Sequence, residues 1–226
     1  MKLRKILALP LTVLATGASA QIVTNGSFET FTGAFAADGG AQLTTASTTL
    51  TGWTIVGGEI AILKTPNAYS LAASAGDNFL DLAGYTNGGF PKGISQVLAA
   101  LTVGQTYSFS MDLGIRNGAC VGGGNNCHGP VQASASIGSI TQTFTEASAV
   151  AGNVWSTFGF DFVATGPSMT LTIDGVSVPA GNEFIGLDNV SVAPAVVTSV
   201  PELETCALLL AGLAVVGSIA RRRGMR

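Results

Sequence analysis

Two cysteines and the only histidine of the chain lie close together. Cys120 and Cys127 flank a loop rich in glycine and asparagine, and His128 follows directly. Thiols of an exported chain are expected to pair, because compartments outside the cytoplasm are oxidising. Zinc bound by these three residues is the alternative, but a fourth ligand is not evident. The sequence therefore predicts a disulfide bond between Cys120 and Cys127.

Nucleophilic catalysis has little support in this sequence. His128 is the only histidine and its neighbour Cys127 is expected to be oxidised, so no Ser-His or Cys-His pair is favoured. Scattered carboxylates could supply the acid and the base of a glycosidase, but their spacing singles out no pair. We therefore expect a protein that is not an enzyme.

Binding of a sugar would need exposed aromatic side chains, because their faces stack on sugar rings while polar groups satisfy the hydroxyls. Tyr85 lies in the turn-forming segment 84–90 and is the better candidate. Trp53 is a second candidate, although it stands beside apolar strand residues, as tryptophans of a core do. Tyr85 and Trp53 are the predicted ligand contacts.

The first twenty residues have the form of a secretory signal peptide. Lys2, Arg4 and Lys5 precede an apolar run, and Ala18-Ser19-Ala20 supplies the small residues that signal peptidase requires. An uncleaved anchor is the alternative, but the run is short for a bilayer. We expect signal peptidase to remove residues 1–20.

The C-terminal end, residues 196–226, is predicted to be a sorting tail. A motif at 200–205 precedes the apolar run 206–220, and an arginine cluster at 221–226 follows. As a helix, the 15 residues of the run would reach only about 22 Å, against a hydrocarbon core of about 30 Å. The arginines should stay cytoplasmic, which leaves residues 21–200 on the far side of the membrane.

This tail resembles the PEP-CTERM sorting signal, in which a Pro-Glu-Pro motif precedes a short apolar helix and an arginine cluster. The resemblance implies transient insertion into the inner membrane and processing by an exosortase. It also implies delivery to the cell surface or extracellular matrix of a Gram-negative bacterium. An ordinary C-terminal membrane anchor is the alternative. The matching residues are Val200, Pro201, Glu202, Arg221, Arg222 and Arg223, with Leu203 in place of the second proline.

The mature region, residues 21–200, is acidic. It has three basic residues, Lys64, Lys92 and Arg116, and eleven acidic ones, which give a net charge of −8. A nucleic-acid partner is not expected, because phosphate binding needs a basic face. A neutral ligand or a cation fits this charge better.

Alternation with period two, the pattern of a half-buried strand, runs through the mature region. It is clearest at residues 105–115 and 131–137, and Gly138-Ser139 can turn the latter into a hairpin with residues 140–145. Many short strands around one core predict an all-β fold, a jelly-roll β-sandwich. Further strands are predicted at residues 53–56, 59–63, 79–82, 94–98, 155–163 and 169–173.

Short motifs in the mature region resemble the successive landmarks of the galactose-binding-like jelly rolls, a superfamily with many carbohydrate-binding modules. The resemblance implies one such domain over residues 21–195 that associates with extracellular polysaccharide. The landmarks are Asn25-Gly26-Ser27-Phe28-Glu29, Gly52-Trp53, Gly93-Ile94-Ser95-Gln96, Gly104-Gln105-Thr106-Tyr107 and Leu187-Asp188-Asn189-Val190-Ser191-Val192.

The last predicted strand contains an irregularity at Asp188. Ile185 and Leu187 have one parity, whereas Val190 and Val192 have the other. The inward-facing register therefore switches at Asp188, as a β-bulge would make it do.

In the jelly rolls that this chain resembles, the first and last strands often hold a calcium ion. By position, the resemblance implies Glu29 and Asp188 as ligands of a structural calcium, which takes several oxygen ligands. The alternative is that Asp188 and Asn189 bond local backbone amides, as such residues often do.

Together these patterns predict an exported, non-catalytic domain that binds carbohydrate in an exopolysaccharide or biofilm matrix. Signal peptidase and exosortase are its expected processing partners. A self-associating matrix protein without a specific ligand is one alternative, and a polysaccharide hydrolase is another. Ice binding is not favoured, because the sequence shows no flat, regularly spaced array of threonines.

Overall fold

The structure is a computed structural model of the chain. The chain divides into two compact units, Met1–Pro194 and Ala195–Arg226. Among the residues that the structure describes, no helix combines the length and the apolar character that crossing a bilayer requires. The described residues are 22–85, 89–116, 130–147, 154–176, 184–196 and 221.

Several predictions concern residues outside these ranges. They are the signal peptide, the disulfide between Cys120 and Cys127, the zinc alternative with His128, and most of the sorting tail, including Val200, Pro201, Glu202, Arg222 and Arg223.

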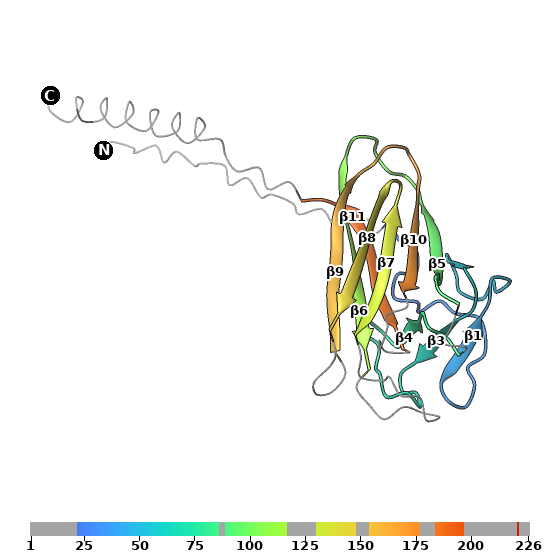
Figure 1. Cartoon of the computed structure of the whole chain (residues 1–226). Helices are drawn as coiled ribbons and strands as arrows, with labels where there is room; N and C mark the ends of the chain where they lie inside the picture. Colours follow the sequence, from blue (N-terminus) through green and yellow to red (C-terminus); the bar gives the residue numbers. More distant parts are fainter. Residues whose placement is uncertain are drawn as a thin grey trace, which may run out of the picture. The chain divides into compact units, whose positions relative to one another are not determined.

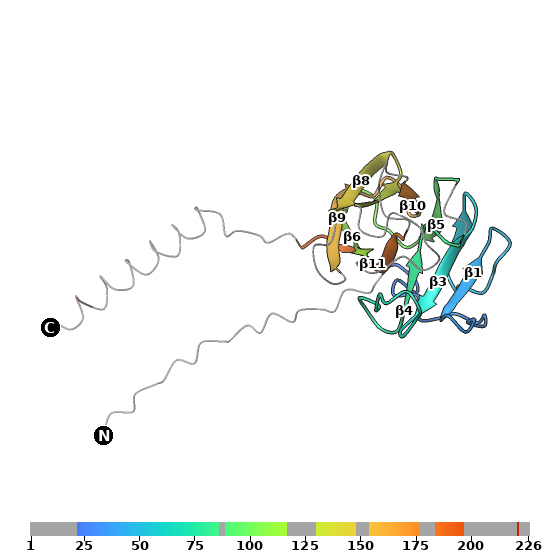
Figure 2. The same ribbon diagram turned by 60° about the horizontal axis from the view of Figure 1, so that its bottom comes forward.

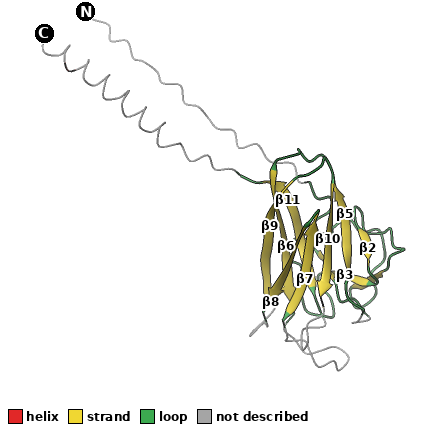
Figure 3. Cartoon of the chain, turned by 45° about the horizontal axis from the view of Figure 1, so that its top comes forward, coloured by secondary structure: helices red, strands yellow, loops and turns green. Residues whose placement is uncertain are grey.

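The described part of the first unit forms eleven strands in two antiparallel sheets, packed face to face (Figure 1 and Figure 3). Figure 2 shows the two layers closer to end-on. In spatial order, the six-stranded sheet contains β1 (Gly40–Leu43), β3 (Ile60–Lys64), β4 (Asn78–Asp81), β11 (Gly186–Pro194), β6 (Thr106–Ile115) and β9 (Val154–Val163). The five-stranded sheet contains β2 (Thr54–Val56), β5 (Lys92–Leu98), β10 (Met169–Val176), β7 (Val131–Ile137) and β8 (Ile140–Glu146).

This architecture confirms the predicted jelly-roll β-sandwich. Alternate residues of the strands face inward and form the core, as Phe109 and Met111 of β6 and Ile173 of β10 illustrate. The predicted hairpin is also present, because β7 and β8 pair with Ile137 opposite Ile140. β1 is the one described strand that the alternation did not predict.

The predicted bulge in β11 is present. Asp188 pairs with Asp112 of β6, and the register resumes only at Ser191, opposite Ser110. Asn189 takes up the irregularity with a left-handed φ of 49°, which asparagine tolerates better than most residues. The bulge keeps apolar residues of both parities in the core and turns Asp188 toward the outer face of the sheet.

The outer face of the five-stranded sheet carries a row of hydroxyls that the sequence alone does not reveal. Each strand contributes one hydroxyl, so the row depends on the register between strands. Neighbouring strands twist by about 20–25°, so the row follows a twisted surface rather than the flat array considered for ice binding. The residues, opposite one another in register, are Thr54, Ser95, Thr172, Ser136 and Thr141.

Candidate functional site

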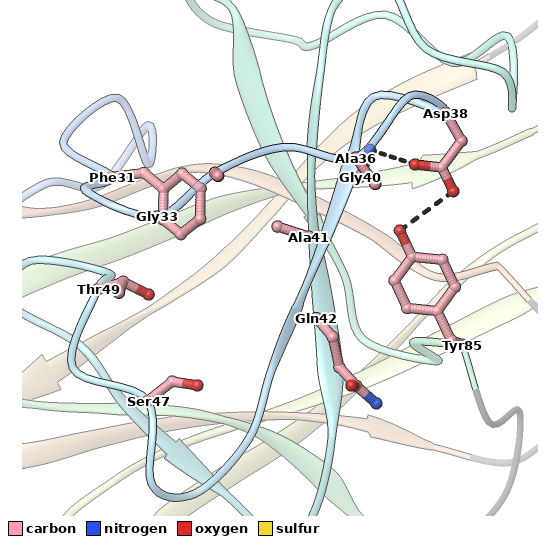
Figure 4. Close-up of a pocket in the computed structure, with 11 residues that line it drawn as sticks. Phe31, Gly33, Ala36, Asp38, Gly40, Ala41, Gln42, Ser47, Thr49 and Tyr85 are labelled. Carbon is pink, nitrogen blue, oxygen red and sulfur yellow. Dashed lines mark hydrogen bonds between the residues drawn. The ribbon is translucent and has the colours of Figure 1, made fainter.

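A pocket of about 540 Å³ lies beside β1, at the edge of the six-stranded sheet. Figure 4 shows Phe31 and Tyr85 on opposite sides of β1, so the pocket has an aromatic side chain at each end. Polar groups stand between and around the two rings. The polar side chains of the lining are Asp38, Gln42, Ser47 and Thr49.

A tight turn presents Asp38 to this pocket. The Gly39 N–H donates to the Ala36 carbonyl at 3.0 Å, and the Ala36 N–H donates to the Gly40 carbonyl at 2.8 Å. Gly39 has a φ of 85°, which glycine adopts without steric cost. The Asp38 side chain completes the turn by accepting the Gly40 N–H on Oδ1 at 2.9 Å.

Two tyrosines converge on the other oxygen of Asp38. The Tyr69 hydroxyl donates to Oδ2 at 2.9 Å, and the Tyr85 hydroxyl donates to the same atom at 3.4 Å. The Gly40 N–H and these hydroxyls lower the pKa of Asp38, against the effect of burial. Burial, with a smaller contribution from Asp38, raises the pKa of Tyr69. At neutral pH the pocket therefore holds a carboxylate with two hydroxyl donors beside it.

Glu59, which pairs with the buried Lys92, holds the backbone of Tyr85 by a hydrogen bond. The Tyr85 N–H donates to Glu59 Oε1 at 2.9 Å, and Glu59 Oε2 lies 3.9 Å from the ammonium of Lys92. Lys92 is only 1% exposed, whereas Tyr85 is 42% exposed. A Cβ at Gly40 would collide with the Tyr85 hydroxyl. The tyrosine is thus anchored by its backbone and leaves its ring open to a ligand.

The two residues predicted to contact a ligand, Tyr85 and Trp53, lie in different places in the structure. Tyr85 lines the pocket, whereas Trp53 does not. Trp53 lies in the core at 5% exposed, with its ring 5.8 Å from that of Phe28. Its indole N–H donates to the Asn25 carbonyl at 2.9 Å. Trp53 therefore supports the fold, because its apolar neighbours draw it inward and its one polar group is satisfied there.

The predicted metal ligands Glu29 and Asp188 reach the same loop, residues 72–78. Glu29 Oε1 accepts the N–H groups of Asp77 and Asn78 at 2.9 Å each. Asp188 Oδ2 accepts those of Ser74 and Ala75 at 2.8 Å each, and Oδ1 accepts the N–H of Asn189. Burial raises the pKa of Asp188 to about 7.

Asp112 adds a third carboxylate to this network. It accepts the hydroxyls of Ser74 and Thr157 and the side-chain amide of Asn189. The indole N–H of Trp155 donates to the carbonyl of Ala72, which holds the start of the loop. Hydrogen bonds from four separate parts of the chain therefore fasten this loop to the sheet.

These bonds bear on the calcium prediction in two ways. Asp188 already accepts three backbone N–H groups, but only that of Asn189 is local, because Ser74 and Ala75 are 114 and 113 residues away in the sequence. Glu29 Oε2, in contrast, accepts no hydrogen bond from the described residues, so its lone pairs are available to coordinate a cation. No three acidic, histidine or cysteine side chains in the described ranges gather as a metal-binding group. Calcium at this loop would therefore need backbone carbonyl oxygens as further ligands.

Sequence reasoning missed most of the pocket. Phe31 and Asp38 lie in a segment without regular alternation of apolar and polar residues. No sequence pattern indicates that Glu59 contacts Tyr85. The turn signal Asp38-Gly39-Gly40 was the one available pointer, because Asp-Gly sequences favour turns that expose the aspartate.

No protein-family model matches the sequence, and none of the curated proteins compared with it does. Three solved structures illustrate the likenesses found. The C-terminal domain of EclA, a sugar-binding protein, is 17% identical over 43% of this chain, with a TM-score of 0.32, and this chain spans 64% of its length. The CBM22-1 xylan-binding domain of Xyn10C from Paenibacillus barcinonensis is 15% identical, with a TM-score of 0.37 and coverage of 68% of this chain and 92% of that one.

The third likeness is to an enzyme. The α-L-arabinofuranosidase MgGH51 is 12% identical, with a TM-score of 0.45 and coverage of 80% of this chain and 27% of that one. Likenesses at these identities concern the fold alone.

Proposed function

We propose that this chain is a non-catalytic carbohydrate-binding domain that uses the pocket beside β1. The observation that carries the proposal is that two aromatic side chains, Phe31 and Tyr85, line one pocket together with four polar side chains. Ring faces pack against the C–H groups of a sugar, and polar side chains satisfy its hydroxyls. A volume of about 540 Å³ falls within the range of ordinary small-molecule sites, roughly 300–1,000 Å³.

The acidic groups of the pocket support binding rather than hydrolysis. Asp38 is the one carboxylate among the described residues that line the pocket. Glycosidases of the usual kind need two carboxylates flanking the scissile bond. A single carboxylate that already accepts three hydrogen bonds suits recognition of a ligand.

We also propose that the protein acts outside the cytoplasm, at the cell surface or in an extracellular polysaccharide matrix. The support is in the sequence: the signal peptide form of residues 1–20 and the PEP-CTERM-like tail at residues 196–226. Fractionation of cells that carry the full chain tests this proposal. Deletion of residues 200–226 should divert the protein from the surface fraction, and an unchanged distribution would count against an exosortase signal.

A structural calcium at the loop 72–78 is part of this proposal. Glu29 and Asp188 would hold it together with backbone carbonyl oxygens, and the ion would stabilise the loop without taking part in ligand binding.

Titration of the purified full-length protein with a panel of oligosaccharides tests the binding function. The detergent must have no sugar headgroup, because such headgroups would compete. Tyr85→Ala should weaken binding about fivefold or more, since a stacked ring contributes of the order of 1 kcal/mol or more. Thr172→Ala, on the outer face of the other sheet, is the matched control and should bind as the wild type does. Absence of heat with every glycan would refute the proposal.

A structural role without a specific ligand is the second candidate, and the edge strands favour it. β8 and β9 end their respective sheets and contain no lysine, arginine or proline. Exposed edges without such residues can pair with a strand of another chain. Sedimentation should then show sugar-independent assembly that Thr143→Lys, at an exposed position of β8, prevents. A monomer at all concentrations would eliminate this candidate.

A further inference from the structure

The surface of this domain is almost devoid of available cations. The mature region has three basic residues, and two of them, Lys92 and Arg116, are only 1% and 5% exposed. The third, Lys64, is exposed, and its ammonium lies over the Phe35 ring at 5.6 Å. The mature region has eleven acidic residues against these three basic ones. The electrostatic field around the domain is therefore negative and attracts cationic ligands.

The lining of the pocket also carries negative charge without positive charge. Asp38 is a carboxylate that lines the pocket, and neither lysine nor arginine is among the described residues that line it. The bond from the Tyr85 hydroxyl to Oδ2 is long, at 3.4 Å. A stronger donor could replace it, and hydrogen bonds to a charged donor are shorter and about twice as strong as neutral ones.

The aromatic walls suit a positively charged sugar as well. An ammonium group is attracted to the face of a tyrosine or phenylalanine ring, because the ring face carries partial negative charge. Tyr85 therefore offers its ring face and stands beside Asp38, so one ammonium could interact with both.

We propose that the pocket selects glycans that carry protonated amino groups, that is, oligomers of de-N-acetylated hexosamine. The inference rests on the proposed carbohydrate-binding function and names its ligand class. Neutral glycans lack the charge that Asp38 recognises, and uronic acid polymers are repelled by the acidic domain.

Three hexasaccharides that differ only at C2 of each glucose unit test this selectivity. They are β-1,4-linked hexaglucosamine, its fully N-acetylated form and cellohexaose, which present an ammonium, an acetamide and a hydroxyl. The full-length protein in a detergent without a sugar headgroup is titrated with each at a pH below the amine pKa. We expect hexaglucosamine to bind about tenfold more tightly than cellohexaose, as one charge-assisted hydrogen bond would give. Its affinity should fall as salt is raised.

Two charge-neutralising variants locate the effect. Asp38→Asn should abolish the preference for hexaglucosamine over cellohexaose, because a neutral amide replaces the carboxylate that would accept the charged donor. Asp161→Asn removes the same charge from an exposed position on β9, at the opposite edge of the sheet from β1. This control should keep the preference. If Asp38→Asn fails to fold, the salt dependence of the wild-type titrations decides the role of charge.

The outcomes separate this inference from the function on which it rests. Equal or tighter binding of cellohexaose or the N-acetylated hexamer overturns the selection of amino sugars and leaves carbohydrate binding standing. Loss of the preference in Asp161→Asn as well as in Asp38→Asn overturns the role of the pocket in that selection. Failure to bind any hexamer or any other glycan of the panel overturns both proposals.

Discussion

The carboxylate of Glu59 accepts the backbone N–H of Tyr85 at 2.9 Å and lies 3.9 Å from the ammonium of Lys92. Glu59 therefore links the buried ammonium of Lys92 to Tyr85, the exposed aromatic residue of the pocket. Glu59→Ala removes both the acceptor and the ion-pair partner, and breaking such a pair costs about 3 kcal/mol of folding free energy. Glycan affinity should fall about tenfold as well, because the Tyr85 backbone is no longer fixed.

Glu59→Gln is the matched control for this prediction. Glutamine removes the charge beside Lys92 but keeps an oxygen that accepts the Tyr85 N–H. Denaturation should therefore show a loss of stability in both variants, whereas calorimetric titration should show a loss of affinity in Glu59→Ala alone. Wild-type affinity in Glu59→Ala would show that Glu59 has no role in positioning Tyr85.

Gly40 controls the space beside the Tyr85 hydroxyl. A Cβ at this position would collide with that hydroxyl, which belongs to the movable end of a side chain. Gly40→Ala should therefore displace the ring and weaken glycan binding about tenfold, while stability changes by less than about 1 kcal/mol. Titration and thermal denaturation of the same preparation check the two parts. Unchanged binding would mean that the ring does not contact the ligand.

The buried carboxyl of Asp81 should make stability depend on pH. Burial raises its pKa from an ordinary 3.8 to about 7, although the N–H groups of Ile185 and Ala83 and the charge of Lys92 oppose this shift. Between these two values the folded protein keeps a proton that the unfolded chain releases. The free energy of unfolding should therefore fall as pH rises from about 4 to about 7 and then level off.

Asp81→Asn tests this sign, because asparagine can still accept both N–H groups but does not titrate. Urea denaturation across this pH range should show a flatter profile for the variant. Asp188 and Asp174 contribute to the remaining slope, because burial raises the pKa of Asp188 to about 7 and also raises that of Asp174. A wild-type stability that rises with pH through this window would contradict the assignment.

Calcium should raise the melting temperature if Glu29 and Asp188 hold it at the loop 72–78. A ligand that binds only the folded state at a hundred times its Kd stabilises that state by about 2.7 kcal/mol. Thermal denaturation in calcium and in a chelator measures the difference, which Asp188→Asn should abolish and Asp161→Asn should preserve. Identical melting temperatures in calcium and chelator would show that hydrogen bonds alone fasten the loop.

Strands that alternate regularly were predictable from the sequence because burial of one sheet face imposes a period of two. Residues 105–115 and 131–145 illustrate this, and both lie in strands or a hairpin of the structure. The change of parity at Asp188 predicted the bulge for the same reason. β1 escaped prediction, because Gly40, Ala41 and Gln42 give too weak a contrast between faces.

The pocket could not be predicted, because it depends on contacts between distant parts of the chain. Asp38 contacts Tyr69 and Tyr85, which are 31 and 47 residues away in the sequence, and no local pattern specifies these contacts. Trp53 shows the converse. Its residue type suggested a ligand platform, but its neighbours in the folded chain place it in the core.

The most direct test of the central claim is to map a bound oligosaccharide by the chemical shifts of backbone amides. The full-length protein is labelled with ¹⁵N and titrated with the tightest-binding glycan of the panel. The pocket proposal predicts shifts confined to residues 31–49 and the neighbourhood of Tyr85. Shifts centred on Thr172 and Ser136, in the hydroxyl row of the five-stranded sheet, would contradict it.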